Sequence, residues 1–306
     1  MSFISSRLKA IQPSPTIAVT QKARDLKAQG QNIIGLGAGE PDFDTPKHII
    51  EAAKKALDNG MTRYTPINGI PELVEAIIEK FRNENKLTYG MDEIAVSCGG
   101  KQVIFNAFMA TLNHGDEVII PTPYWVSYPD IVLMFEGKPV FIECPEDMNF
   151  KITPEKLDAA ITSKTKWLIL NSPANPSGSA YTLDEYKDLA DVLLKYPHVW
   201  ILTDDIYEHV IYEDFNFHTI AQVQPELKDR TLTLNGFSKA YCMTGWRVGY
   251  AGGPNSLINS MTKVQSQSTT HTAAVSQAAS LAALNGPQDF IKSNNKIFQS
   301  RRDLVV

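Results

Sequence analysis

Short apolar runs alternate with helical segments from residue 93 onward, and no other feature of the sequence constrains its fold as strongly. Most of these runs are apolar throughout, which is typical of strands that are covered on both faces. Strands and helices in alternation form a mostly parallel α/β sheet. Seven runs are predicted to be strands: Glu93–Ser97, Glu117–Ile120, Pro139–Glu143, Trp167–Asn171, Trp200–Thr203, Thr231–Leu234 and Val248–Ala251.

Helix signals lie between these strands and at both ends of the chain. In the segment 182–195, Thr182 and Glu185 have the spacing of a capping box. The apolar residues of this segment form one stripe at helical spacing: Leu183, Tyr186, Leu189 and Leu193. Thr45 before a proline is typical of a helix start. Residues 287–306 are predicted to form one long helix.

The composition is that of an ordinary globular protein, with 43% of the 306 residues hydrophobic and 21% charged. The net charge of -5 gives no basic excess, so nucleic acid is not an expected partner. The three cysteines and six histidines are scattered, so their spacing predicts no metal site and no disulfide framework. Because the N-terminus lacks a secretory signal and no run is long enough for a membrane span, the protein is predicted to be cytoplasmic.

The strongest candidates for chemistry are Lys239 and Arg247, in the segment NGFSKAYCMTGWRVGY. A lone lysine is most often a surface charge. Arg247, however, lies in an apolar stretch that leads into a predicted strand, and buried arginines usually pair with an anion. Both residues lie at strand ends, where open α/β sheets bind ligands. One anionic ligand could be held by Arg247 at a phosphate and by Lys239 through an imine.

Asp204 directly follows a predicted strand, and Tyr207 comes three residues later. The simplest alternative is a surface aspartate before a helix. An acid placed beneath a heteroaromatic nitrogen, however, keeps that nitrogen protonated, and a phenol hydroxyl can bond the ring oxygen. Pyridoxal phosphate (PLP) needs this arrangement in order to act as an electron sink.

Four weaker signals accompany these residues. Asn175, in NSPANPSG, could donate to a ring oxygen or to a substrate carboxylate, although this segment could be only a turn. Gly100 begins a predicted helix, where backbone N–H groups can approach a phosphate. Trp125, in PTPYWVSYP, could stack on a flat cofactor or only cover the core. Tyr64, in TRYTPING, indicates nothing by itself.

The segments NSPANPSG, TDDIYEH and NGFSKAYCMTGWRVGY together resemble the class I aminotransferases of fold type I, and most closely the bacterial aspartate aminotransferase subgroup. The resemblance covers the whole chain and implies a mostly parallel seven-stranded sheet sandwiched by helices, with an incomplete small domain. It implies an N-terminal arm and part of the small domain over residues 1–44, and a large PLP-binding domain over 45–288. Residues 289–306 are then the start of the C-terminal small domain, whose remainder is expected beyond this sequence.

The resemblance also implies roles for the candidate residues. Lys239 is expected to be the Schiff-base lysine, Asp204 the partner of the ring nitrogen, and Tyr207 a partner of the ring oxygen. The implied cofactor-binding residues are Tyr64, Gly100, Lys101 (through its backbone N–H), Trp125, Asn175, Asp204, Tyr207, Lys239 and Arg247. The implied substrate-binding residues are Gly39, Trp125 and Asn175. Tyr64 is expected to reach the phosphate of a neighbouring subunit, which implies a homodimer.

The implied reaction is transamination between L-aspartate and 2-oxoglutarate, and three alternatives stay open. The first is another PLP reaction on the same fold, of the β-lyase type. The second is an aminotransferase for prephenate or aromatic substrates. A cation in the N-terminal segment would favour a larger dicarboxylate such as prephenate, but the residue there is the neutral Gln12. The third is a chain that binds PLP without turnover, because the arginine that binds the substrate α-carboxylate in this family is expected beyond residue 306.

Overall fold

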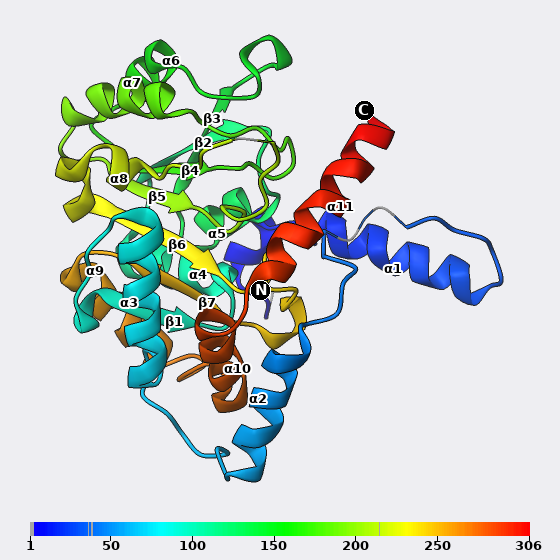
Figure 1. Ribbon diagram of the computed structural model, residues 1–306. Helices are drawn as coiled ribbons and strands as arrows, with labels where there is room; N and C mark the ends of the chain where they lie inside the picture. Colours follow the sequence, from blue (N-terminus) through cyan, green and yellow to red (C-terminus); the bar gives the residue numbers. More distant parts are fainter. Residues whose placement is uncertain (1–2, 36, 38, 214) are drawn as a thin grey trace.

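A seven-stranded sheet forms the centre of the computed structural model, which describes residues 3–35, 37, 39–213 and 215–306 (Figure 1). All seven predicted strands are confirmed, and none of their ends moves by more than two residues. The strands are β1 (Ile94–Ser97), β2 (Glu117–Thr122), β3 (Lys138–Glu143), β4 (Thr165–Asn171), β5 (Trp200–Asp204), β6 (Thr231–Gly236) and β7 (Gly249–Gly252).

The sheet is mostly parallel, as predicted, with the order β1-β7-β6-β5-β4-β2-β3. β7 alone runs antiparallel to its two neighbours, β1 and β6. Gly249, at the start of β7, is therefore paired with Gly236, at the end of β6. As a result, the residues just before β7 lie at the same edge of the sheet as the residues that follow the parallel strands, which is the usual ligand-binding edge of such folds.

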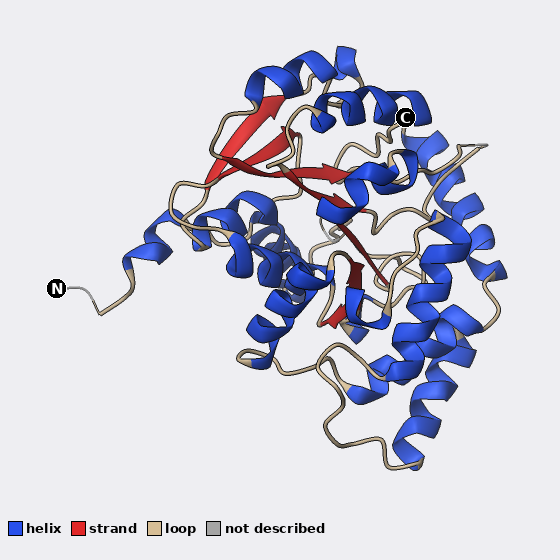
Figure 2. Ribbon diagram, turned by 90° about the vertical axis from the view of Figure 1, so that its left-hand side faces the viewer, coloured by secondary structure: helices blue, strands red, loops and turns tan. Residues whose placement is uncertain are grey.

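Helices cover both faces of the sheet (Figure 2). On β4, Trp167 and Ile169 pack with helices α4, α5 and α9, whereas Leu168 and Leu170 pack with α6 and α7. This alternation explains why β4 is apolar throughout. The helices are α1 (Pro15–Ala28), α2 (Lys47–Asp58), α3 (Pro71–Asn85), α4 (Gly100–Thr111), α5 (Ser127–Met134), α6 (Pro154–Ala160), α7 (Leu183–Leu194), α8 (Ile220–Val223), α9 (Asn255–Ser266), α10 (Ala274–Asn285) and α11 (Asp289–Val305).

Two details of the helix starts depend on the tertiary structure. Leu183, in the apolar stripe predicted for α7, is the first residue of the helix and is 40% exposed. The capping box of Thr182 and Glu185 is confirmed. Thr45 was expected to cap α2, but its hydroxyl instead donates to the carbonyl of Cys242 at 2.6 Å, so the cap position falls on Pro46. The Thr45 hydroxyl therefore binds a residue far away in the chain instead of the first turn of α2.

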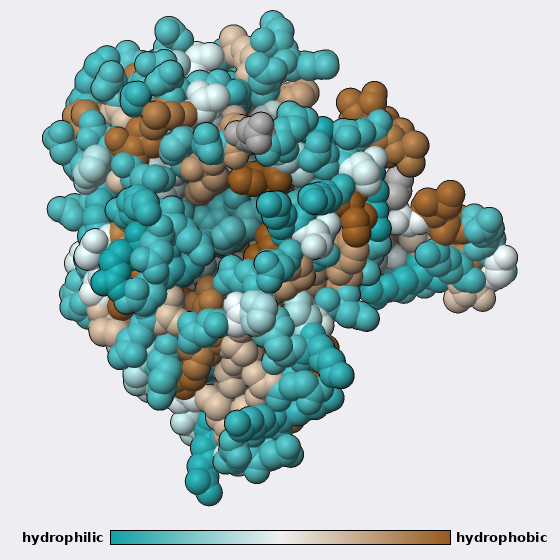
Figure 3. Space-filling model, viewed as in Figure 1, coloured by the Kyte–Doolittle hydropathy of each residue, from teal (hydrophilic) through white to brown (hydrophobic). Residues whose placement is uncertain are grey.

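α1 and α11 project from the same side of the molecule in Figure 1. α11 is tied to the loop before α2, since the Arg301 guanidinium contacts both carboxylate oxygens of Asp42 at 2.7 and 3.0 Å. The Phe43 and Phe298 rings pack edge to face beside this pair. Apolar side chains at the outer end of α11, including Val305, are exposed (Figure 3). None of the described helices has both the length and the apolar character needed to cross a bilayer.

Candidate active site

A cavity of about 540 Å³ lies at the edge of the sheet where β4, β5 and β6 end. The structure brings nine of the ten predicted site residues together in its lining. These nine residues are Gly39, Gly100, Lys101, Trp125, Asn175, Asp204, Tyr207, Lys239 and Arg247. The tenth, Tyr64, lies elsewhere.

Lys239 lies in the connection between β6 and β7, beside the loop that contains Gly39. Its ammonium group donates to the Gly39 carbonyl and lies 5.5 Å from the centre of the Tyr207 ring. Burial lowers the pKa of Lys239, although the carboxylates of Asp204 and Glu40 act in the opposite direction. A lowered pKa increases the fraction of neutral amine, which is the form that attacks a carbonyl group.

Arg247 precedes β7 in the left-handed backbone conformation, with φ of 57°. Its guanidinium donates to the carbonyls of Thr244 at 3.0 Å and Cys98 at 3.4 Å. It packs so closely on Gly99, which has φ of 86°, that a Cβ atom there would overlap it. Gly100 then begins α4, whose free N–H groups and dipole favour an anion. We call Gly99, Gly100 and Arg247 the anion cradle; together they suit a phosphate.

Asp204 is the last residue of β5 and is only 5% exposed. Its Oδ2 accepts a hydrogen bond from the Tyr128 hydroxyl at 2.7 Å, and its Oδ1 accepts a longer one from the Ile206 N–H at 3.4 Å. Burial raises the pKa of Asp204 to about 6, against the opposing effect of these hydrogen bonds and of the Lys239 charge. Such a carboxyl group is ready to pair with a cation in the cavity.

Asn175 and Tyr207 are connected, since the Asn175 side-chain amide donates to the Tyr207 hydroxyl at 3.4 Å. Asn171, at the end of β4, holds both segments. Its Oδ1 accepts from the Asn175 N–H at 2.7 Å, and its Nδ2 donates to the Asp204 carbonyl at 2.8 Å. The polar groups on the loops after β4 and β5 are therefore fixed relative to each other.

Trp125 and Lys101 form the wall of the cavity next to α5. The Lys101 ammonium lies 4.9 Å from the centre of the Trp125 ring. Burial, with a contribution from the Arg247 charge, lowers the pKa of Lys101. The Trp125 ring in turn meets Tyr128 edge to face, with ring centres 5.4 Å apart.

Several residues of this cavity were not predicted from the sequence. Tyr128 and Asn171 occur inside segments that were singled out, but nothing in the sequence indicated their contacts with Asp204. Their only signal was a polar group at or near a strand end. The contact of α1 with the cavity was not predicted either. Its lining residues are Thr16, Ile17, Thr20, Gln21 and Arg24.

Tyr64 does not reach this cavity. Its side chain is 89% exposed and packs edge to face on His271, with ring centres 5.6 Å apart. It lines a separate hollow that also includes Arg63, Ala274 and Val275. Within one chain, therefore, the structure separates Tyr64 from the other candidates.

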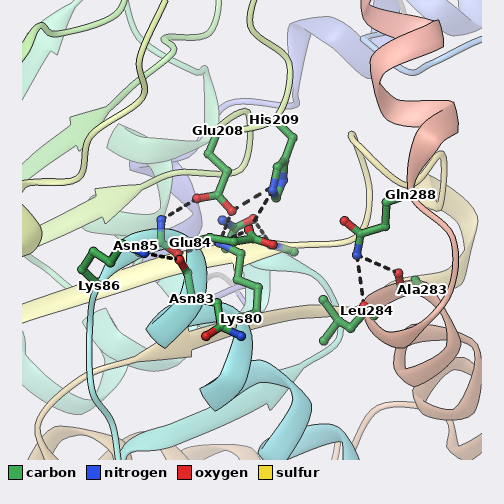
Figure 4. A network of polar contacts seen from close by, with 12 residues as sticks. Lys80, Asn83, Glu84, Asn85, Lys86, Glu208, His209, Ala283, Leu284 and Gln288 are labelled. Carbon is green, nitrogen blue, oxygen red and sulfur yellow. Dashed lines mark hydrogen bonds and ion pairs between the residues drawn. The ribbon is translucent and has the colours of Figure 1, made fainter.

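Figure 4 shows a polar network that includes Glu208, the residue that follows Tyr207 in the chain. Lys80 of α3 pairs with Glu208 and donates to Asn85 Oδ1 at 2.7 Å, while Asn85 Nδ2 donates to Glu208 at 2.7 Å. His209 contacts Glu84 at 2.9 Å. Although the ligand atoms of Glu84, Glu208 and His209 lie close together, the Lys80 ammonium already supplies the positive charge of this cluster.

The profile of the family "Aminotransferase class I and II" matches residues 31–306. The aspartate/prephenate aminotransferase of Cereibacter sphaeroides is 58% identical over 306 residues, which cover 100% of this chain and 76% of the relative. The aspartate aminotransferase of Rhizobium meliloti is 57% identical over 302 residues, which cover 99% of this chain and 74% of the relative.

Solved structures give the same family. The aspartate aminotransferase from Rhizobium meliloti superposes with a TM-score of 0.97 at 56% identity, covering 100% of this chain and 76% of that one. The aspartate aminotransferase from Thermus thermophilus with maleate superposes with a TM-score of 0.96 at 44% identity, covering 99% of this chain and 79% of that one.

PLP, the cofactor of this family, fits the residues that line the cavity. The anion cradle suits its phosphate, because glycine leaves the α4 N-terminus and the Arg247 guanidinium accessible. The buried carboxyl group of Asp204 suits a ring nitrogen that must stay protonated, and the Lys239 amine suits an aldehyde. From its sequence, its fold and this site, the chain belongs to the class I and II aminotransferases, enzymes that use pyridoxal phosphate.

Proposed function

We propose that the chain transfers an amino group between L-aspartate and 2-oxoglutarate. The observation that carries the proposal is the convergence of Lys239, Asp204 and the anion cradle on one cavity. Several relatives, including the one from Rhizobium meliloti, are named aspartate aminotransferase, which supports aspartate as the amino donor.

The proposed chemistry assigns a task to each group of this chain. When bound, PLP supplies an electron sink for the substrate α-carbon. The Lys239 amine would hold the cofactor covalently until the substrate amino group replaces it there, and the freed Nζ would then move a proton as general base and acid. The Asp204 carboxylate keeps the ring nitrogen protonated.

The remaining residues bind and orient. The anion cradle and the Lys101 backbone N–H bind the phosphate, and Trp125 stacks on the ring. Tyr207 donates to the ring oxygen. Asn175, which already contacts the Tyr207 hydroxyl, shares this task. Gly39, Trp125 and Asn175 also contact the substrate in this proposal.

We propose further that the working unit is a cytoplasmic homodimer. The exposure of Tyr64, away from the cavity of its own chain, supports a contact with the phosphate of a partner subunit. The domain division of the sequence analysis, with 45–288 as the large domain, is part of the same proposal. Its support is the contact of Asp42 and Phe43 with α11, which joins residues 1–44 to 289–306.

Prephenate is the second candidate substrate, because the relative from Cereibacter sphaeroides is named aspartate/prephenate aminotransferase. Gln12 is exposed and lies just before α1, the helix that lines the cavity. A neutral side chain there provides no extra cation for a larger dicarboxylate, so aspartate remains the first choice.

The test is to add PLP to the purified chain, record its absorbance, and then add aspartate. The proposal predicts an absorbance band of lysine-bound cofactor that shifts with aspartate and yields oxaloacetate and pyridoxamine phosphate. Release of ammonia would indicate a lyase instead, and a band that ignores aspartate would indicate binding without turnover. Lys239→Ala should lose both the band and turnover; retained turnover would remove Lys239 from the mechanism.

A further inference from the structure

We propose that Tyr128 is a positioning residue that holds the Asp204 carboxylate ionised and oriented toward the cofactor ring nitrogen. The inference rests on the proposed cofactor role of Asp204 and extends it to a residue of α5. Although Tyr128 also lines the cavity, its hydroxyl is bound to the Asp204 carboxylate, so it acts on the cofactor through that carboxylate.

The geometry around Tyr128 leaves its hydroxyl little freedom. The side chain is 2% exposed, and its ring meets Trp125 edge to face. Its backbone N–H donates to the Trp125 carbonyl at 3.1 Å, which fixes the start of α5. From this position its hydroxyl lies 2.7 Å from Asp204 Oδ2, the distance of a strong charge-assisted hydrogen bond.

Tyr128 provides the shortest hydrogen bond to the Asp204 carboxylate among the described residues. The Ile206 N–H is more distant, at 3.4 Å, and the Asn171 amide binds the Asp204 backbone carbonyl instead. Two other titratable groups face Asp204: Lys239 from the β6–β7 connection and Tyr207 from the turn after β5. Neither of these is hydrogen-bonded to the carboxylate within the described residues.

Tyr128 can act only as a donor in this pair. Burial and the Asp204 charge raise the pKa of Tyr128 well above its ordinary value, so the phenol keeps its proton. A donor to a carboxylate stabilises the ionised form and opposes the effect of burial. Without the hydroxyl, the pKa of Asp204 would rise above about 6, and a larger fraction of the site would hold a neutral acid that cannot pair with a ring cation.

The experiment compares Tyr128→Phe with Tyr186→Phe, which also loses a fully buried tyrosine hydroxyl but one that makes no hydrogen bond to Asp204 within the described residues. The dissociation constant of PLP is measured from pH 5 to 9 by fluorescence, and the absorbance of the bound cofactor is titrated over the same range. Each value is expressed as a ratio to the parent chain, so that the titration of other groups cancels. Thermal unfolding verifies that each variant folds.

We expect Tyr128→Phe to weaken PLP binding about tenfold near pH 6 and to move the absorbance midpoint to higher pH by about one pH unit. Tyr186→Phe should change neither quantity. In an Asp204→Asn background, Tyr128→Phe should have no further effect on the midpoint, because no carboxylate remains.

An unchanged affinity and midpoint in Tyr128→Phe, with only a loss of thermal stability, would overturn the inference. The same holds if Tyr128→Phe shifts the midpoint equally in the Asp204→Asn background. Failure of the parent chain to bind PLP would overturn the proposed function as well, so the two failures are distinguishable.

Discussion

Asp204 is a residue whose folding and working requirements conflict. Folding buries its carboxyl group, whereas the proposed function needs the group charged. Burial raises the pKa of Asp204 from 3.8 to about 6. Between these two pH values, the carboxyl group stays protonated in the folded chain but is ionised in the unfolded chain. Stability from this group is therefore complete below about pH 4 and is lost as pH rises through about 6.

Asp204→Asn should accordingly stabilise the cofactor-free chain. The cost of ionising the buried carboxyl group is removed, so we expect the free energy of unfolding to rise by up to about 3 kcal/mol at pH 7.5 and to change little at pH 4. Urea unfolding at both pH values measures this difference. Asp58→Asn, on the exposed end of α2, should change stability by less than about 0.5 kcal/mol. Equal stability of Asp204→Asn and the parent chain at pH 7.5 would contradict the prediction.

Gly99 tests the anion cradle at the same scale. Gly99→Ala should weaken the binding of PLP and of inorganic phosphate, because the new methyl group displaces the Arg247 guanidinium. Its positive φ should also cost about 1–3 kcal/mol of stability. Gly115 is the matched control, since it has φ of 83° but open space around its Cβ position. Gly115→Ala should lose a similar amount of stability but keep its affinity for phosphate. If both variants lost affinity, the loss in Gly99→Ala could not be assigned to displacement of Arg247.

Single residues were predictable from the sequence where a reactive group lies at or near the end of a strand. Lys239, Asp204 and Arg247 all line the cavity for this reason. Tyr128 and Asn171 were not predictable, because their importance comes from contacts with Asp204. Tyr128 is 76 positions from Asp204 in the chain, and Asn171 is 33 positions from it. Ordinary local patterns do not encode such distant partners.

At the scale of elements, α3 supports the turn after β5 through Lys80 and Glu208. Both side chains are almost fully buried. Although burial raises the pKa of Glu208, the Lys80 charge and the hydrogen bonds from Lys80 and Asn85 act against it, and the pKa is held below its ordinary value. Glu208 directly follows Tyr207, so this pair fixes the turn that presents Tyr207 to the cavity.

Lys80→Met should destabilise the chain by about 3–5 kcal/mol, because Glu208 would remain buried without its countercharge. The double change Lys80→Met and Glu208→Leu should recover much of this loss, since it removes both charges. Urea unfolding of the two variants measures the difference. Glu51→Gln breaks an exposed pair with Lys54 and should cost at most about 1 kcal/mol. A double variant no more stable than Lys80→Met would contradict this account.

The order of strands and helices was predictable because burial on both faces requires continuous apolar runs. Element ends were less predictable, since local signals compete with distant partners. Thr45 is such a case: its hydroxyl binds Cys242 rather than capping α2. The contact of α1 with the cavity likewise depends on tertiary packing and left no mark on its own sequence.

At the scale of the whole molecule, the proposed dimer makes a prediction about mixed subunits. Tyr64→Ala and Lys239→Ala chains should each be impaired alone. In a mixed dimer, one site would carry both changes and the other would be intact. Refolding the two variants together should therefore restore about a quarter of the parent activity. If the activity of the mixture did not exceed the summed activities of the two separate variants, the result would argue against a shared site. Two Lys239→Ala preparations that are refolded together serve as the control.

The reversed direction of β7 also limits how this chain can vary in length. Lys239 and Arg247 are eight positions apart in one hairpin, and each is proposed to hold a different end of the same ligand. A residue inserted between them would change the span of the ligand site even if the pairing of Gly236 with Gly249 were kept. An insertion in the connection 145–151, after the edge strand β3, would alter no such span. Insertions and deletions are thus tolerable at the outer edge of the sheet and excluded from the hairpin at its ligand-binding edge.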